Sequence, residues 1–269
     1  MSQASLAQHL HDRYDIREFN DDSYWEWGGE RMGFKLGAKI EKLREPLVNG
    51  KATAQDYLKF YDIIATQPAL SVVHSLKTGA MIASGKWIEQ QIRNLGLNPK
   101  KWLDVGCHTG HITSYYASTF PDTDVTGIDL ARVAISTARQ LGIERNLSFF
   151  RDDLLTHQGS YDIITSTQSV AASSSAEMLP HIKRLLSEGG SFLAVEACGT
   201  KADRRTWIDE AKKAGLALKT VDIVLFSTLG DEEAYTAFHC TNQKADSLAP
   251  AAWEESISDQ LAKLLLPNN

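Results

Sequence analysis

The sequence predicts an α/β fold, a doubly wound sheet of seven strands with a helical extension on its N-terminal side. Two observations support this prediction. From residue 98 onward, short apolar runs alternate with amphipathic helical segments, which is typical of a parallel sheet covered by helices on both faces. Farther along, two β-like runs are joined by a turn too short for a crossover helix, so they must pair antiparallel. Five parallel strands and one antiparallel C-terminal hairpin are therefore expected.

The first third of the chain has the apolar spacing of helices. Apolar residues recur every three or four positions between Met32 and Leu47, and the pattern ends near Pro46 and the Asn-Gly turn that follows it. Thr53 with Asp56 is typical of a helix start, because the two residues can cap each other's backbone N–H groups. The helices expected in this region are 32–47, one that begins at 53, and 71–95.

The rest of the chain alternates β-like and helical segments. The strands expected here are 102–105, 125–129, 147–150, 161–165 and 192–196, and the helices are 110–119, 131–141, 175–186 and 203–214. A Gly189-Gly190 turn should lead into the fifth strand, residues 216–227 and 233–241 should form the hairpin, and a last helix should follow Pro250. The domains expected are a helical cap and substrate region at 1–97, a ligand-binding Rossmann-like domain at 98–243, and a C-terminal helix at 244–269 packed on the core.

Composition and charge exclude several classes of protein. Hydrophobic residues make up 43% of the sequence and charged residues 23%, which argues against disorder. The formal net charge of −6 makes a nucleic-acid substrate unlikely on electrostatic grounds. No apolar run reaches the ~20 residues of a membrane helix, and the first ten residues lack the apolar run of a signal peptide. The cysteines, Cys107, Cys198 and Cys240, are far apart, so we expect no disulfide framework, no metal site, and a cytoplasmic location.

The most informative segment joins the first strand of the α/β region to its first helix, with the sequence LDVGCHTGHI at residues 103–112. In open parallel sheets, ligands bind at the carboxyl ends of the strands, where this loop lies. Gly106 and Gly110 allow the backbone to turn sharply and to approach a ligand closely. The following helix presents unpaired N–H groups. Asp104 adds a carboxylate, which favours a cationic or amine-bearing ligand over a diphosphate.

Acidic residues also follow the next two strands. Asp129 ends the second strand, where a carboxylate can accept hydrogen bonds from ribose hydroxyls. Asp152 and Asp153 follow the third strand, where a carboxylate could receive an adenine amino group. Taken singly, Asp129 could instead cap the next helix, and the other two could be solvated turn residues. Acids at three successive strand ends together favour a site for ribose and adenine with a cationic neighbour.

These motifs resemble those of the class I S-adenosylmethionine (AdoMet)-dependent methyltransferases, over about residues 100–242. The resemblance implies AdoMet as the cofactor and S-adenosylhomocysteine as the product. It implies that the Asp104–Gly110 segment packs against the methionine part, that Asp129 holds the ribose, and that Asp152 contacts the adenine. The cofactor-binding residues expected on this basis are Asp104, Gly106, Cys107, His108, Gly110, Asp129, Leu130, Asp152, Asp153, Leu154 and Ser166.

One position departs from the family pattern, because His108 stands where the family usually has glycine. Its side chain should either point away from AdoMet or reach the space near the sulfonium. In the second case it could orient a substrate or act as a base, since imidazole titrates near neutrality. The candidate proton acceptors are His108, His111, Glu196 and His181, each of which could equally be structural.

The substrate side carries fewer signals. The polar loop at 166–173 lacks the Asn/Asp-Pro-Pro-Tyr/Phe and Pro-Cys motifs of enzymes that methylate nucleic-acid bases. The aromatic run at 24–27 is either a buried helix connection or a lid over the methyl-transfer cleft. The substrate-binding candidates are Tyr14, Tyr24, Trp25 and Trp27.

The expected function is AdoMet-dependent O- or N-methylation of a small molecule or peptide by a monomer or homodimer. Two alternatives stay open: an AdoMet-binding regulatory or partner subunit that does not methylate, and an RNA methyltransferase. An NAD-dependent dehydrogenase is disfavoured, because dinucleotide loops normally have three glycines and no acid in front of them.

Overall fold

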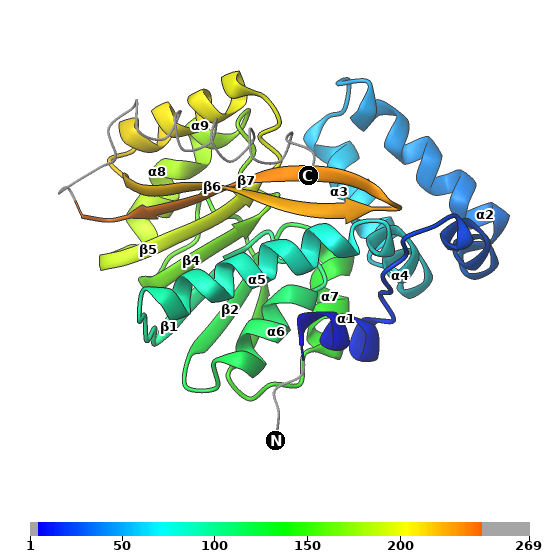
Figure 1. The fold of residues 1–269 in the computed structure, drawn as a ribbon, viewed down its shortest axis with the longest axis horizontal. Coiled ribbons are helices and arrows are strands. Elements are labelled where there is room, and N and C mark those ends of the chain that lie inside the picture. Colours follow the sequence, from blue (N-terminus) through cyan, green and yellow to red (C-terminus); the bar gives the residue numbers. More distant parts are fainter. Residues whose placement is uncertain (1–4, 244–269) are drawn as a thin grey trace, which may run out of the picture. The chain divides into compact units, whose positions relative to one another are not determined.

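The computed structural model describes residues 5–243, whose helices and strands are drawn in Figure 1. The first helices are α1 (Leu6–Tyr14), α2 (Ser23–Val48), α3 (Ala54–Ile64), α4 (Gln67–Ser75) and α5 (Thr78–Asn94). The α/β region continues with β1 (Lys101–Val105), α6 (His111–Thr119), β2 (Asp124–Asp129), α7 (Arg132–Leu141), β3 (Leu147–Arg151) and β4 (Tyr161–Thr167). It ends with α8 (Ser175–Leu185), β5 (Leu186–Glu196), α9 (Lys201–Lys213), β6 (Ala217–Thr228) and β7 (Asp231–Thr241). The helix expected after Pro250 lies outside the described residues.

The strands form one seven-stranded sheet in the order β3-β2-β1-β4-β5-β7-β6. The pairs β1–β4, β2–β3 and β4–β5 are parallel, and β7 runs antiparallel to β5. The predicted sheet, five parallel strands closed by a hairpin, is therefore confirmed. Strand order reverses between β1 and β4, and ligands of open α/β sheets bind at the carboxyl ends of the strands beside such a reversal.

The chain forms two compact units, each built from several segments. The first contains the described residues up to Lys86, together with Cys107–Asp153 and Phe226–Glu233. The second contains Trp87–Gly106, Leu154–Leu225 and the described residues from Ala234. The domain boundaries expected from the sequence, at residues 97 and 243, stay a prediction.

A small apolar cluster in the first unit fixes the glycine-rich loop. Cys107 packs with Ile135 and Ala138 of α7 and with Phe149 of β3, and all four side chains are buried. The loop after β1 is thereby held against the helix and the strand that follow β2 in the chain.

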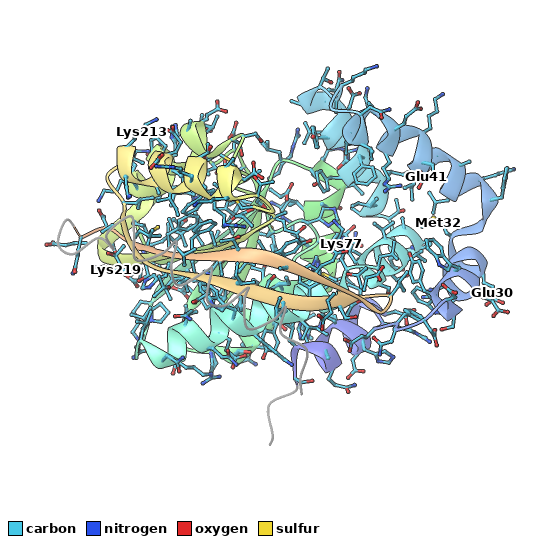
Figure 2. The ribbon with its side chains drawn as sticks, turned by 45° about the horizontal axis from the view of Figure 1, so that its top comes forward. Glu30, Met32, Glu41, Lys77, Lys213 and Lys219 are labelled. Atoms are coloured by element: carbon cyan, nitrogen blue, oxygen red, sulfur yellow. The ribbon has the colours of Figure 1, made fainter. Side chains whose placement is uncertain are left out.

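Some helix boundaries differ from the prediction. The helix expected at 32–47 begins at Ser23, and its two segments meet at Gly33, whose φ of 67° breaks the helical path. Figure 2 labels Glu30 on the first segment and Glu41 on the second. Pro46 lies in the last turn of this helix, which ends at Val48, one residue beyond the predicted end.

The single helix expected at 71–95 is also wrong, because α4 and α5 are separate helices. At the break, the Thr78 hydroxyl donates a hydrogen bond to the Arg17 carbonyl oxygen at 2.7 Å. In β5, Gly189-Gly190 lies within the strand rather than before it, where the pairing with β4 shifts register. The Thr53–Asp56 capping box is present as predicted.

Trp207 of α9 is, with Trp102, one of the two largest fully buried side chains of the second unit. Its fully buried ring stacks on Phe238 of β7 with the ring centroids 3.9 Å apart, and its indole N–H donates to the Val170 carbonyl oxygen at 3.0 Å. The side chain therefore contributes both apolar burial and a satisfied hydrogen bond.

Trp207→Ala is expected to lower the free energy of unfolding by about 3–5 kcal/mol, because it opens a large cavity and leaves the Val170 carbonyl unpaired. Urea denaturation followed by circular dichroism measures the change. The matched control is Trp25→Ala, whose ring is 60% exposed, and which should change the stability by no more than ~0.5 kcal/mol. Equal losses in the two variants would contradict this assignment.

Candidate functional site

The loop between β1 and α6 has an alternating left-handed backbone. Gly106, His108 and Gly110 have φ values of 71°, 50° and 72°. The turn is closed by two backbone hydrogen bonds, from Cys107 N–H to the Ile128 carbonyl at 3.1 Å and from Gly110 N–H to the Cys107 carbonyl at 2.8 Å. The sharp turn expected from the glycines is present, and His108 adopts it despite its side chain.

The glycines are also required by packing within the chain. A Cβ on Gly110 would lie 2.2 Å from Cζ of Phe149, and a Cβ on Gly106 would lie 2.0 Å from Oγ of Ser169. Both distances are impossible for real contacts, so any larger residue must displace a neighbour. We expected the two glycines to allow close approach of a ligand to the backbone. In the structure, the side chains of Phe149 and Ser169 occupy the space beside them.

Asp129 holds this loop through its carboxylate. One oxygen accepts the His108 N–H at 2.9 Å, and the other accepts the Ala131 N–H at 2.8 Å. The capping role considered for Asp129 is thus partly right, because its carboxylate bonds the chain just before α7 although Ala131 is the N-cap residue. Each carboxylate oxygen keeps capacity for a further hydrogen bond.

The acids after β2 and β3 lie side by side in the first unit. The Asp152 N–H donates to the Asp129 carbonyl at 3.2 Å, and the Asp152 carboxylate accepts the Asp153 N–H at 2.8 Å. Both Asp152 and Asp153 are half-buried, whereas Leu130 is 46% exposed beside them. The structure thus brings together four of the predicted cofactor residues, Asp129, Leu130, Asp152 and Asp153.

Asp104 lies in the second unit and is almost fully buried. Its carboxylate accepts a hydrogen bond from the Thr165 hydroxyl at 2.8 Å, and the same hydroxyl oxygen accepts the Trp102 indole N–H at 2.9 Å. Thr165 therefore orients the carboxylate at the end of β1. Leu154, another predicted cofactor residue of this unit, is also buried.

Ser166 and Glu196 meet at the ends of β4 and β5. The Ser166 hydroxyl donates to Glu196 Oε1 at 2.6 Å, and the Val170 N–H donates to the same oxygen at 3.1 Å. Glu196 Oε2 is buried and has no hydrogen-bond partner among the described residues. Burial raises the pKa of Glu196 to about 7, against the opposing effect of these hydrogen bonds. The carboxyl can therefore hold or release a proton near neutral pH.

Four histidines gather around the loop in the first unit. His108 Nε2 donates to the Tyr61 carbonyl at 3.1 Å, and His111 Nδ1 lies 3.2 Å from the Thr109 hydroxyl. The ring of His74, on α4, lies 5.3 Å from that of His108 and 4.9 Å from that of His111. His9 of α1 completes the group through Nε2, 2.8 Å from the Ser114 hydroxyl.

Burial keeps these imidazoles neutral. It lowers the pKa of His9 to about 4 and that of His111 to about 3, and it lowers the pKa values of His74 and His108 as well. His9 and His74 were missed by the sequence analysis, because each lies in a helical run with no motif around it. His181 of α8 has a buried Nδ1 without a partner among the described residues.

The four aromatic substrate candidates have different environments. Tyr14 is buried and touches the loop, because its hydroxyl lies 3.2 Å from the Gly110 carbonyl and 2.8 Å from the Ser114 hydroxyl. Tyr24 is also buried, and its hydroxyl donates to the Val72 carbonyl at 2.8 Å. The half-buried ring of Trp27 contacts two arginine guanidinium groups, whereas Trp25 is exposed.

Residues 5–243 contain neither a membrane-spanning helix nor a cluster of metal-binding side chains. None of the helices in this range is long and apolar enough to cross a membrane. Within the same range, no group of three or more His, Cys, Asp or Glu side chains is arranged to hold a metal ion.

The central segment is similar to known proteins. A family model described as a methyltransferase domain matches residues 103–192. These residues are therefore similar to a methyltransferase domain. This segment begins in β1, includes the loop and all three acidic strand ends, and reaches into β5.

Two curated relatives of the chain are malonyl-[acyl-carrier protein] O-methyltransferases. The protein of Paenibacillus sp. (strain JDR-2) is 32% identical over 115 residues, which cover 39% of this chain and 41% of that protein. The protein of Bacillus anthracis is 24% identical over 160 residues, covering 59% and 48%. The chain thus spans less than half the length of these relatives.

A solved structure supports the fold. A Galdieria sulphuraria protein, assigned as a sarcosine dimethylglycine methyltransferase, aligns with a TM-score of 0.50 and 14% identity. The alignment covers 60% of this chain and 85% of that protein.

Gly110→Ala is expected to lower the free energy of unfolding by about 2–4 kcal/mol, because it adds left-handed strain and a clash with Phe149. The matched control is Gly29→Ala in α2, where a Cβ would meet nothing within 4 Å. The control should stabilise the protein by ~0.5–1 kcal/mol, since alanine is the better helix former. Chemical denaturation of both variants measures whether the free energy of unfolding falls in Gly110→Ala and rises in Gly29→Ala. An unchanged free energy of unfolding in Gly110→Ala would contradict the packing argument.

Glu196 should make the protein less stable as the pH rises. Its folded-state pKa of about 7 exceeds its ordinary value of 4.5, so between these values the unfolded chain releases the proton while the folded chain keeps it. Stability from this group is complete below pH 4.5 and falls by about 3 kcal/mol by pH 8. In Glu196→Gln this pH-dependent loss should disappear.

The measurement is the difference in unfolding free energy between Glu196→Gln and the unmodified protein at pH 4.5 and at pH 8. The difference should move in favour of the variant as the pH rises. Glu188→Gln, at an exposed position of the same strand, is the control for any general effect of removing a carboxylate. A difference for Glu196→Gln that does not change with pH would show that the buried carboxyl is not protonated.

Proposed function

We propose that this chain is an AdoMet-dependent methyltransferase that methylates an oxygen or nitrogen of a small molecule or peptide. The observation that carries the proposal is the left-handed loop after β1, held by the Asp129 carboxylate through the His108 N–H. The loop lies at the carboxyl end of the parallel strands and precedes a helix N-terminus, the position where α/β sheets bind nucleosides.

The residues at these strand ends fit AdoMet, which supplies a methyl group already activated on a cationic sulfur. The Asp129 oxygens each accept one N–H and can accept ribose hydroxyls with their remaining lone pairs. Asp152, adjacent in the same unit, suits the adenine amino group. The buried carboxylate of Asp104 suits the ammonium group of the methionine part.

His108 supports the proposal in spite of its departure from the family's glycine. Its backbone keeps a positive φ, and its side chain bonds to the Tyr61 carbonyl in α3. The low pKa values of the surrounding histidines also suit a cationic cofactor, because neutral imidazoles do not repel it.

Glu196 is the strongest candidate for a proton acceptor, because its pKa of about 7 allows proton uptake at neutral pH. Ser166 orients one oxygen, and the other has no partner among the described residues. His108 and His111 stay as alternatives, although their low pKa values make them weaker bases.

We further propose a carboxylic acid as the acceptor, with malonyl-[acyl-carrier protein] as the first compound to test. The support is the printed activity of the Paenibacillus and Bacillus anthracis relatives. Their matches cover less than half of each relative, so the substrate side of this chain can differ. Tyr14, which contacts the loop, is the aromatic candidate best placed to contribute.

Asp129→Asn should weaken AdoMet binding by at least about tenfold, because the amide nitrogen cannot accept the bonds that a carboxylate oxygen accepts. Isothermal titration calorimetry with AdoMet measures the effect, and circular dichroism checks that the variant is folded. Asp122→Asn, at an exposed turn residue, is the control. Failure of the unmodified protein to bind millimolar AdoMet would overturn the proposal.

Catalysis is tested by incubating the protein with AdoMet and malonyl-[acyl-carrier protein] and detecting the methyl ester by mass spectrometry. Methyl ester formation supports the acid substrate. Binding of AdoMet without transfer to this or other hydroxyl, carboxyl and amine acceptors would instead favour the non-methylating alternative.

A further inference from the structure

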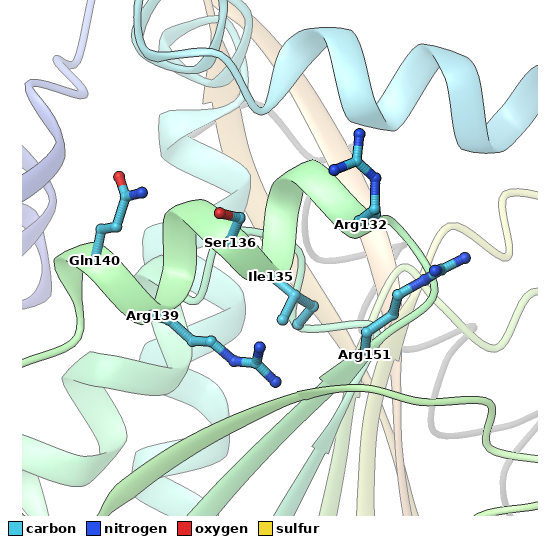
Figure 3. A pocket seen from close by; sticks show the side chains of 6 residues that line it. All are labelled: Arg132, Ile135, Ser136, Arg139, Gln140 and Arg151. Atoms are coloured by element: carbon cyan, nitrogen blue, oxygen red, sulfur yellow. The ribbon is translucent and has the colours of Figure 1, made fainter.

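A hollow of about 410 Å³ lies in the first unit and is lined by none of the predicted cofactor residues. Figure 3 shows its side chains, which come from α7 and from the end of β3. They are Arg132, Ile135, Ser136, Arg139, Gln140 and Arg151. This arginine hollow is defined by these six residues, none of which is among the residues expected to bind AdoMet.

The α7 residues of the hollow form one helical face. Residues that are three, four, seven or eight positions apart lie on the same side of a helix. These spacings relate all pairs among Arg132, Ser136, Arg139 and Gln140 except the direct neighbours Arg139 and Gln140. Arg132 and Arg139 are seven residues apart, so their Cα atoms are separated by about 10 Å along the axis. Except for Ile135, every lining side chain can donate hydrogen bonds.

Two of the arginines are held in place by the backbone. Arg139 Nε donates to the Phe149 carbonyl at 2.9 Å, and Arg151 Nε donates to the Leu130 carbonyl at 3.2 Å. Because β3 is the edge strand of the sheet, its outer carbonyls can be bonded by side chains. These bonds use one N–H of each guanidinium and leave the terminal nitrogens available, in planes that are already fixed.

No carboxylate neutralises the hollow. None of Arg132, Arg139 and Arg151 takes part in an ion pair among the described residues, and no acid lines the hollow. Asp152 and Asp153 follow Arg151 directly, but neither lines the hollow, and the Asp152 carboxylate accepts the Asp153 N–H. Asp129 binds backbone N–H groups, and Glu144 pairs with Arg13. Three like charges around one hollow repel each other, and a bound anion relieves this repulsion.

We propose that the arginine hollow is a binding site for a diphosphate group. A single carboxylate can occupy only one guanidinium fork, whereas three forks spread along two helical turns suit two linked phosphoryl groups. Ser136 and Gln140 supply neutral donors beside them. The site uses none of the residues assigned to AdoMet as ligands, although Arg151 donates to the Leu130 carbonyl and Ile135 packs on Cys107.

The test is calorimetric titration of the full chain with pyrophosphate, ADP, orthophosphate and citrate at matched ionic strength, in the absence of AdoMet. Pyrophosphate and ADP should bind, orthophosphate should bind at least about tenfold more weakly, and citrate should not compete. ADP binding tighter than pyrophosphate would identify a nucleotide as the source of the diphosphate, whereas equal affinities would identify the diphosphate alone.

Arg132→Gln is the decisive variant, because Arg132 makes no hydrogen bond or ion pair with the described residues, so its loss should not disturb the fold. It should weaken pyrophosphate binding about tenfold or more. Arg145→Gln, an exposed arginine of the same unit outside the hollow, removes the same charge and should leave binding unchanged.

Three outcomes would overturn the proposal: no pyrophosphate binding, equal weakening by the two substitutions, or citrate binding as tightly as pyrophosphate. Binding of a poly-glutamate peptide in place of pyrophosphate would also overturn it, and would assign the hollow to an acidic protein. None of these results depends on whether the chain transfers methyl groups.

Discussion

The hydrogen bond between the His108 N–H and the Asp129 carboxylate is the constraint on which the loop after β1 depends. A residue with a side chain adopts a positive φ only at some energetic cost. Here the charged acceptor stabilises that conformation, and the closing bonds at Cys107 and Gly110 follow from the same turn. The carboxylate that we propose as the ribose acceptor therefore also maintains the backbone on which the nucleoside would rest.

Burial has opposite effects on the acids and bases of the site. Loss of water disfavours any charge, so the pKa of Glu196 rises and the pKa values of His9, His74, His108 and His111 fall. At neutral pH the four histidines are uncharged and Glu196 is about half protonated. The aspartates at the strand ends differ from Glu196 in that each accepts a hydrogen bond from an N–H or O–H donor without a partnerless buried oxygen among the described residues.

The order of strands and helices in the α/β region follows from the sequence, because the switch between strand-like and helical apolar spacing is local. The broken helix at 76–77 does not, because the amphipathic pattern continues across it. The break coincides with a hydrogen bond between Thr78 and the distant Arg17 carbonyl. Likewise, Gly189-Gly190 is a strong local turn signal that the tertiary structure overrides.

The candidate site was predictable where its residues follow strands, as with Asp104, Asp129 and Asp152. The histidine group was only half predictable, because His9 and His74 reach the loop through the packing of α1 and α4, which no short-range pattern encodes. The face of α7 in the arginine hollow is periodic in the sequence, but the contribution of Arg151 depends on where β3 ends beside that helix.

The contact of His108 with Tyr61 and His74 has a consequence for protein engineering. A glycine at this position would have no side chain to contact the neighbouring helices. The imidazole of His108 instead contacts Tyr61 of α3 and His74 of α4. The loop and these two helices therefore form a single transplantable module. In a chimera that contains only the loop, the buried His108 ring would lack its hydrogen-bond partner. The loop, α3 and α4 must therefore be transferred together.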